Sequence, residues 1–245
     1  MVNKNVLRLL VLLTIPMLFV FGKFGAPEHF PILIKKVEEK LRPEKVEAPD
    51  LSSYSSTLAC IEESRIKLKK ELEASGTKNF DKAADLWTDF MVDSIFPYWY
   101  GTEWDFNGHT DSPRKGQIAC GYFVSTTMRH SGIKLDRYKL AQKAASDIIN
   151  EVCVKGSAKW FSLLDDLSNH IKGRPDGLYV LGLDYHVGFV LRENGKNYFI
   201  HSDYFNGKVT KEELKKSTAA NSTDRYYIGS LSENKELMKR WLIGN

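Results

Sequence analysis

One cysteine in this 245-residue chain is placed where it could carry out covalent chemistry. Cys120 begins a segment, Cys-Gly-Tyr-Phe-Val-Ser-Thr-Thr-Met, whose apolar residues recur with helical spacing. The sequence therefore predicts a helix with Cys120 in its first turn. Unpaired backbone N–H groups and the positive end of the helix dipole would lower the pKa of the thiol there. A thiolate formed near neutral pH is a nucleophile, whereas a lone cysteine can equally be a small buried apolar residue.

Two histidines on a predicted β-hairpin favour the nucleophile. Alternating apolar runs flank Asn194-Gly195, the dipeptide that best suits a two-residue type I′ turn. The register of this turn sets Gly188 opposite His201 and His186 opposite Asp203. The two histidines and the carboxylate then share one face of the hairpin, while the other face is apolar. A histidine that accepts the thiol proton, oriented by a second polar group, is what thiol-based acyl transfer requires.

These stretches resemble the papain-like cysteine peptidases of the NlpC type, which cleave cell-wall peptides. The resemblance rests on Cys120-Gly-Tyr-Phe-Val, His186-Val-Gly-Phe-Val-Leu and Tyr-Phe-Ile-His201, in the order that the family shows, and covers about residues 95–230. It implies that Cys120 is the nucleophile, His186 the base and His201 the residue that orients His186. Asp203 is the rival for that orienting role, because the hairpin register places it across from His186.

The resemblance also implies an oxyanion site. The family has a tyrosine in a Y-x-x-G stretch upstream of the cysteine, and Tyr98 in Tyr-Trp-Tyr-Gly matches it. Gln117, three residues before Cys120, is a second candidate, since a glutamine has that role in papain-like enzymes. The chain departs from the family where Ala119 replaces the usual acidic residue before the cysteine. An insertion before Cys120 and a long segment after it also bear on the identity of the substrate.

We therefore expect a cysteine hydrolase that cleaves a peptide or a peptidoglycan stem peptide and needs no cofactor or metal. An acyltransferase or amidase with a substrate outside the cell wall would use the same residues. A non-catalytic envelope protein that retains the fold is a third possibility. The fourth is a metal site, because cysteine and histidine together can bind zinc; its ligands would be Cys120, His186, His201 and Asp203.

Composition limits the other classes of function. Hydrophobic residues make up 42% and charged residues 27% of the chain, enough for one good-sized domain and an additional arm. The net charge of +4 comes from basic residues interspersed with acidic ones. We therefore expect no nucleic-acid partner.

The first 57 residues read as a leader and a linker. Basic residues precede an uncharged apolar run at 9–22, so residues 1–30 are predicted to be a signal peptide or an N-terminal anchor. We accordingly expect export to the periplasm or cell envelope, with membrane association through residues 6–22. Residues 31–57 are rich in charge and proline and are predicted to be a linker.

The remaining residues, 58–245, are predicted to form one papain-like catalytic domain of the α+β class. Its nucleophile-bearing helix would pack on an antiparallel sheet, with additional N-terminal helices at 58–74 and 80–96. Beyond the site, we expect helices at 136–152, 158–171, 211–216 and 233–242, and strands at 177–184 and 225–231.

The chain has two further cysteines, Cys60 and Cys153. In an oxidising compartment Cys60 and Cys153 could form a disulfide, which would leave Cys120 free. The favoured alternative is that both are buried thiols.

Overall fold

The computed structural model describes residues 49–76 and 80–244, which belong to one compact unit spanning Ala48–Asn245. The predicted leader at 1–30 and most of the predicted linker at 31–57 lie outside the described residues. The end of that linker is structured, because a 3₁₀ turn at Leu51–Ser53 leads directly into α3 at Tyr54. Across the described residues, no helix combines the length and the apolar character needed to span a membrane.

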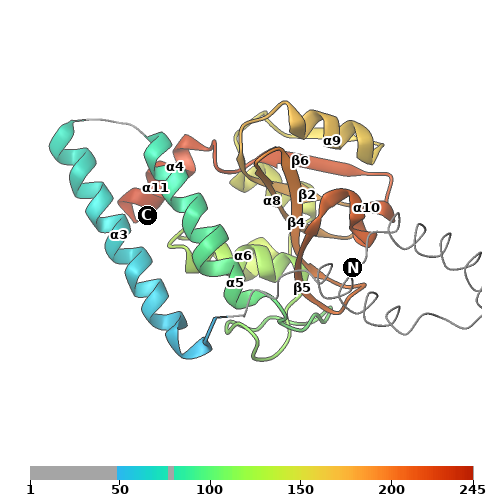
Figure 1. Ribbon diagram of the computed structural model, residues 1–245, viewed down its shortest axis with the longest axis horizontal. Coiled ribbons are helices and arrows are strands. Elements are labelled where there is room, and N and C mark those ends of the chain that lie inside the picture. The colour runs from blue at the N-terminus through green and yellow to red at the C-terminus, as the bar shows by residue number, and fades with distance from the viewer. Residues whose placement is uncertain (1–48, 77–79, 245) are drawn as a thin grey trace, which may run out of the picture. The chain divides into compact units, whose positions relative to one another are not determined.

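A six-stranded antiparallel sheet forms the centre of the unit, so the predicted α+β class is confirmed (Figure 1). The strand order is β1-β6-β2-β3-β4-β5. The hairpin of β3 and β4 therefore lies between β2 and the edge strand β5. The strands are β1 (Lys159–Phe161), β2 (Gly177–Gly182), β3 (Val187–Glu193), β4 (Lys196–Asp203), β5 (Lys208–Glu213) and β6 (Tyr226–Ser230).

Helices cover both faces of the sheet. Phe189 and Ile200 belong to a core with α6 (Cys120–His130) and α8 (Ala145–Val152). Val190 and Phe199 belong to a second core with α9 (Leu164–Lys172) and α10 (Thr218–Asn221). The prediction of one apolar and one polar hairpin face is thus wrong over most of the hairpin, since α9 and α10 bury the second face as well.

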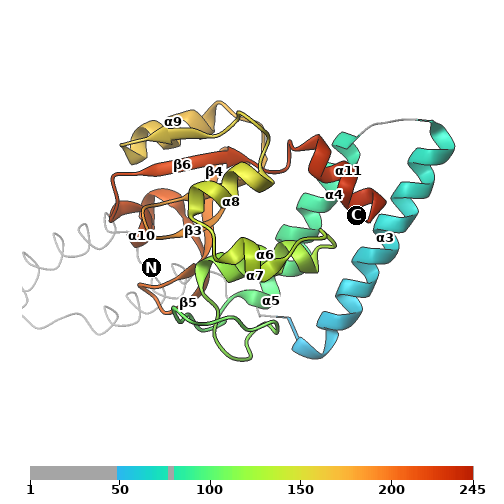
Figure 2. The same ribbon diagram turned by 180° about the vertical axis from the view of Figure 1, so that it is seen from behind.

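Helices from both ends of the described chain form a separate layer. In Figures 1 and 2, α3 (Tyr54–Ser75), α4 (Phe80–Asp89) and α11 (Lys235–Ile243) stand together at the end of the unit away from α10. A π-helical segment, η2 (Phe90–Ile95), continues α4 into α5 (Phe96–Trp99). The predicted stop before Pro97 is therefore wrong. A proline in the first turn of a helix is tolerated because its missing N–H needs no intrahelical partner there.

Three other element predictions need correction. The helix expected at 136–152 is split into α7 (Arg137–Ala141) and α8, and the carboxylate of Asp136 caps α7. In place of the single helix expected at 158–171, the short strand β1 precedes α9. The first half of the helix expected at 211–216 is the end of β5, and the second half is the 3₁₀ turn η3 (Leu214–Lys216). Polar edge strands lack the apolar alternation that identifies a strand in sequence.

Candidate active site

Cys120 is the first residue of α6, as predicted, and is half-buried. The preceding Ala119 has extended backbone (φ −79°, ψ 162°) and supplies no side-chain cap, so the first N–H groups of α6 have no partner from this residue. Gly121 allows α7 to approach: a Cβ at this position would lie 2.4 Å from the carbonyl oxygen of Ala141. The start of α6 is thus fixed by packing against α7.

The hairpin has the predicted register. Glu193 pairs with Lys196 and Phe189 with Ile200, and the turn residues have positive φ, 51° at Asn194 and 76° at Gly195. Gly188 lies where the sheet must accept a ring from the neighbouring strand. A Cβ at Gly188 would be 2.7 Å from the Cβ of His201, so the glycine makes room for this histidine.

Three buried side chains form a chain of hydrogen bonds. The Nε2 atom of His186 lies 2.8 Å from Nδ1 of His201, and Nε2 of His201 lies 3.2 Å from Oε1 of Glu212. His186 is 4% exposed and His201 is fully buried. Burial raises the pKa of Glu212, but hydrogen bonds from His201 and Ser217 outweigh it, so the pKa is lowered and the carboxylate is ionised.

The ionised carboxylate sets the tautomers along this chain. Because Glu212 can only accept, a neutral His201 donates from Nε2 and its Nδ1 is an acceptor. His186 must then donate from Nε2, which leaves the lone pair on its Nδ1. A histidine in this tautomer can accept a proton from a thiol at Nδ1. The chain of hydrogen bonds therefore leaves the acceptor nitrogen of His186 at Nδ1.

Cys120 and the start of β3 lie together. The backbone N–H groups of Val187, Gly121 and Cys120 itself are directed at the sulfur. Val187 directly follows His186 in sequence. The ring of Tyr204 packs against the ring of His186, with centroids 5.3 Å apart. Burial, then Asp203 and then Cys120 raise the pKa of its hydroxyl, so Tyr204 also lies near the sulfur. The predicted nucleophile, base and orienting histidine are thus gathered at one end of the sheet.

The thiol and the imidazole are both neutral at rest. Burial raises the pKa of Cys120, and the surrounding N–H groups only partly oppose it, so the lowered pKa expected from the helix terminus is wrong. Burial, and then the electrostatic effect of the neighbouring His201 ring, lowers the pKa of His186 well below its ordinary value. A neutral imidazole is the form that can accept a proton. These two shifts favour a neutral thiol and a neutral imidazole over a thiolate–imidazolium pair.

The predicted oxyanion donor Tyr98 is placed elsewhere. Its hydroxyl lies 2.6 Å from Oγ of Ser53 and 3.0 Å from Oγ1 of Thr57, at the start of α3. The hydroxyl of Tyr98 is thus engaged at the start of α3 and not beside Cys120. The expectation that Tyr98 is an oxyanion donor is therefore corrected. Gln117 is exposed in the segment before the nucleophile.

The rival orienting residue Asp203 is used by the β4–β5 turn. Its fully buried carboxylate accepts the N–H of Phe205 at 2.9 Å and the side-chain amide of Asn206. His186 instead bonds to His201. Asp203 therefore holds the turn, and His201 takes the orienting position.

Sequence reasoning missed two residues that position the site. Glu212 was not identified because the sequence predicts a helix at 211–216, whereas the residue lies on β5. Ser202, fully buried on β4, donates to the carbonyl oxygen of Ile118 at 2.6 Å and so ties β4 to the residues before Cys120. A serine between two predicted site residues, His201 and Asp203, was the available signal.

The set of side chains that could hold a metal ion differs from the predicted one. His201, Asp203 and Glu212 offer ligand atoms within 4.8 Å of one another. The predicted set had Cys120 and His186 in place of Glu212. The hydrogen bonds above already use the three groups, which fits a polar network that supports His186.

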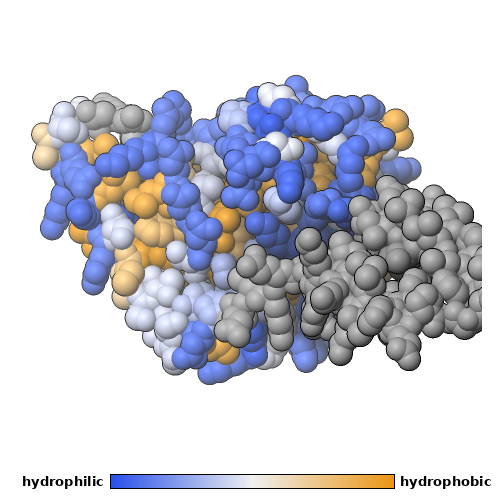
Figure 3. Space-filling view, viewed as in Figure 1, coloured by the Kyte–Doolittle hydropathy of each residue, from blue (hydrophilic) through white to orange (hydrophobic). Residues whose placement is uncertain are grey.

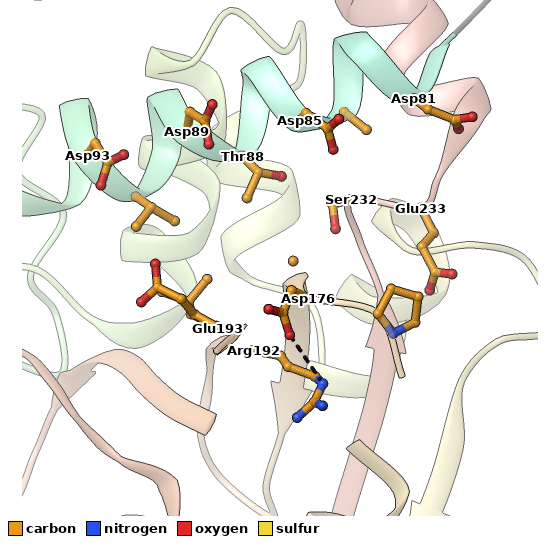
Figure 4. A pocket seen from close by; sticks show the side chains of 15 residues that line it. Asp81, Asp85, Thr88, Asp89, Asp93, Asp176, Arg192, Glu193, Ser232 and Glu233 are labelled. Atoms are coloured by element: carbon orange, nitrogen blue, oxygen red, sulfur yellow. Dashed lines mark ion pairs between the residues drawn. The ribbon is translucent and has the colours of Figure 1, made fainter. Parts of the chain in front are cut away.

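Two hollows lie apart from these residues. An acidic one separates carboxylates of α4 and η2 from Asp176, Glu193 and Glu233 (Figure 4). Apolar side chains also reach the surface between α3 and α4 (Figure 3), where Leu72 and Phe80 line a groove. Neither hollow is lined by a candidate catalytic residue.

The other cysteines are free thiols in different environments. Cys60 is exposed on α3, which corrects the expectation that it is buried. Cys153 is buried, and its burial raises the thiol pKa. Neither lies in the polar network.

Comparison with protein-family models, with curated proteins and with solved structures finds no match for this chain. Its function is therefore argued from the geometry of the site.

Proposed function

We propose that this protein is a cysteine hydrolase with a papain-like arrangement, in which Cys120 is the nucleophile and His186 the general base. The observation that carries the proposal is the chain from Glu212 through His201 to His186, which leaves the lone pair on Nδ1 of the base. The resemblance of the three motif stretches to NlpC-type peptidases supports the same roles. By that resemblance, the substrate is a peptidoglycan stem peptide or another short peptide.

The proposed roles of Cys120 and His186 account for each step of hydrolysis. Sγ of Cys120 attacks the amide carbonyl while its proton passes to Nδ1 of His186. The backbone N–H of Cys120 stabilises the oxyanion, and His186 returns the proton to the leaving amine as the C–N bond breaks. Water, deprotonated by His186, then cleaves the thioester and regenerates the thiol. An acyltransferase would follow the same first step with another acceptor in place of water.

Mass spectrometry of reaction mixtures tests the proposal. The protein would be incubated with peptidoglycan fragments and with a panel of short peptides, and both products and intact protein would be weighed. We expect cleaved peptide and a transient acyl adduct on Cys120, both abolished by Cys120→Ala and reduced about 10²-fold or more by His186→Ala.

The outcomes separate the alternatives. Cleavage of peptides but not of wall fragments would assign another amide substrate to the same residues. Binding of wall fragments without any adduct or cleavage would contradict the hydrolase and favour the non-catalytic envelope protein. The predicted location in the cell envelope, through residues 1–30, remains part of the proposal and is tested by fractionation of cells.

A further inference from the structure

Three aromatic rings stand beside the candidate nucleophile and have no part in the chemistry above. Tyr204 and Phe205 form the β4–β5 turn, with ring centroids 4.4 Å apart, and Trp104 lies 6.1 Å from Tyr204. Tyr204 also packs against His186. We refer to Trp104, Tyr204 and Phe205 as the aromatic wall.

The aromatic wall is held by hydrogen bonds on both sides. The buried carboxylate of Asp203 accepts from the backbone of Phe205. The N–H of Trp104 donates to the carbonyl oxygen of Gly207 at 2.9 Å, and Glu103 bridges to Lys208. The rings are therefore presented by a fixed turn between two strands, docked against the segment that leads to α6.

The rings keep apolar surface in contact with solvent. Tyr204 is 40% exposed and Phe205 is 49% exposed. Single exposed apolar residues are normal on protein surfaces. Two adjacent exposed rings, one of which packs against the candidate base His186, are different, because apolar lining with a few polar groups is typical of ligand sites.

We propose that the aromatic wall binds an apolar side chain of the substrate next to the carbonyl that Cys120 attacks. This inference rests on the proposed function and names a specificity for it, namely amide substrates with an aromatic or large aliphatic group near the scissile bond. Tyr204 and Phe205 select that group by stacking and burial of apolar surface. Asp203 acts as a positioning residue, because it fixes the turn that carries both rings.

Alkylation of the three cysteines provides the test without knowledge of the substrate. N-benzyl-2-iodoacetamide and 2-iodoacetamide react by the same displacement of iodide and differ only in an apolar ring. The rate ratio of the two reagents at Cys120 would be divided by the same ratio at the exposed Cys60 in the same sample. The buried Cys153 stays unlabelled while the protein is folded, and so reports on its integrity.

We expect the corrected ratio at Cys120 to favour the benzyl reagent, and to fall about tenfold when Tyr204 and Phe205 are both replaced by alanine. Trp160→Ala is the matched control, because Trp160 is an exposed ring (62%) on β1 at the opposite edge of the sheet. If labelling of Cys153 shows that the double variant is not folded, Phe205→Ala alone is measured in its place, with a smaller fall expected.

A corrected ratio near one in the wild-type protein, or one unchanged by the variants, would overturn the aromatic wall as an apolar subsite. Failure of the proposed function has a different signature. In that case the rate with 2-iodoacetamide at Cys120 does not depend on His186, whatever the benzyl ratio is.

Discussion

At the scale of single residues, the proposed mechanism depends on the carboxylate of Glu212, which contacts His201 and has no proposed contact with the substrate. Glu212 fixes the tautomer of His201, and His201 fixes that of His186. In Glu212→Gln the neutral amide can donate to Nε2 of His201 as well as accept from it, so it no longer fixes the two tautomers and a proton can occupy Nδ1 of the base. We expect alkylation of Cys120 near pH 7 to fall about tenfold.

A neighbouring carboxylate provides the control for that prediction. Glu213→Gln removes an exposed charge that pairs with Lys216 and leaves the chain of hydrogen bonds intact. Its alkylation rate should match that of the wild type. Undiminished alkylation in folded Glu212→Gln would contradict the tautomer assignment.

At the scale of elements, Gly188 lets the hairpin carry the two histidines. In Gly188→Ala the new Cβ would lie 2.7 Å from the Cβ of His201 and 2.8 Å from the ring of Phe199, so His201 must move. We expect a loss of about 1–3 kcal/mol in the free energy of unfolding, measured with urea. The alkylation rate of Cys120 should fall as well, because His201 no longer orients His186.

A second glycine separates destabilisation from damage to the site. In Gly229→Ala on β6, the Cβ would lie 2.7 Å from Ile149 and 2.8 Å from Cys153, away from the histidines. This variant should lose comparable stability and keep the alkylation rate of Cys120. If the alkylation rate of Cys120 fell equally in both folded variants, general packing and not the position of His201 would determine the reactivity of the thiol.

Local signals predicted the hairpin and the start of α6 from sequence. A type I′ dipeptide fixes the register of two strands, and the register fixes which side chains are diagonal neighbours. The hydroxyl of Tyr98 could not be placed, because its partners Ser53 and Thr57 come from a distant helix. The buried state of Cys120 depends on tertiary packing that helical spacing does not contain, so the direction of its pKa shift was missed.

At the scale of the whole described unit, Arg65 joins its N-terminal and C-terminal helices. Its Nη1 donates to the carbonyl oxygens of Trp241 and Leu242 at 2.9 Å each, at the end of α11 where unpaired carbonyls need donors. In Arg65→Ala the carbonyl of Leu242 loses this donor, and the carbonyl of Trp241 keeps only the N–H of Gly244. We expect the free energy of unfolding to fall by about 1–3 kcal/mol.

The exposed pair of Lys82 and Glu71 provides the comparison for Arg65. It also joins two helices, but its side chains remain largely in water. Lys82→Ala should therefore leave the urea midpoint unchanged. An unchanged midpoint in Arg65→Ala would show that the contact between α3 and α11 does not support the unit.

The pH dependence of alkylation at Cys120 tests the central claim most directly. The base must be neutral to accept the thiol proton, and burial lowers the pKa of His186, so the neutral form persists as the pH falls below 6.5. With 2-iodoacetamide we predict a rate that is level between about pH 6.5 and 8 and declines only at lower pH. In His186→Ala the rate should be low and rise with pH, because burial raises the pKa of the unassisted thiol. A wild-type rate that rises through this range in parallel with His186→Ala would contradict the Cys120–His186 pair.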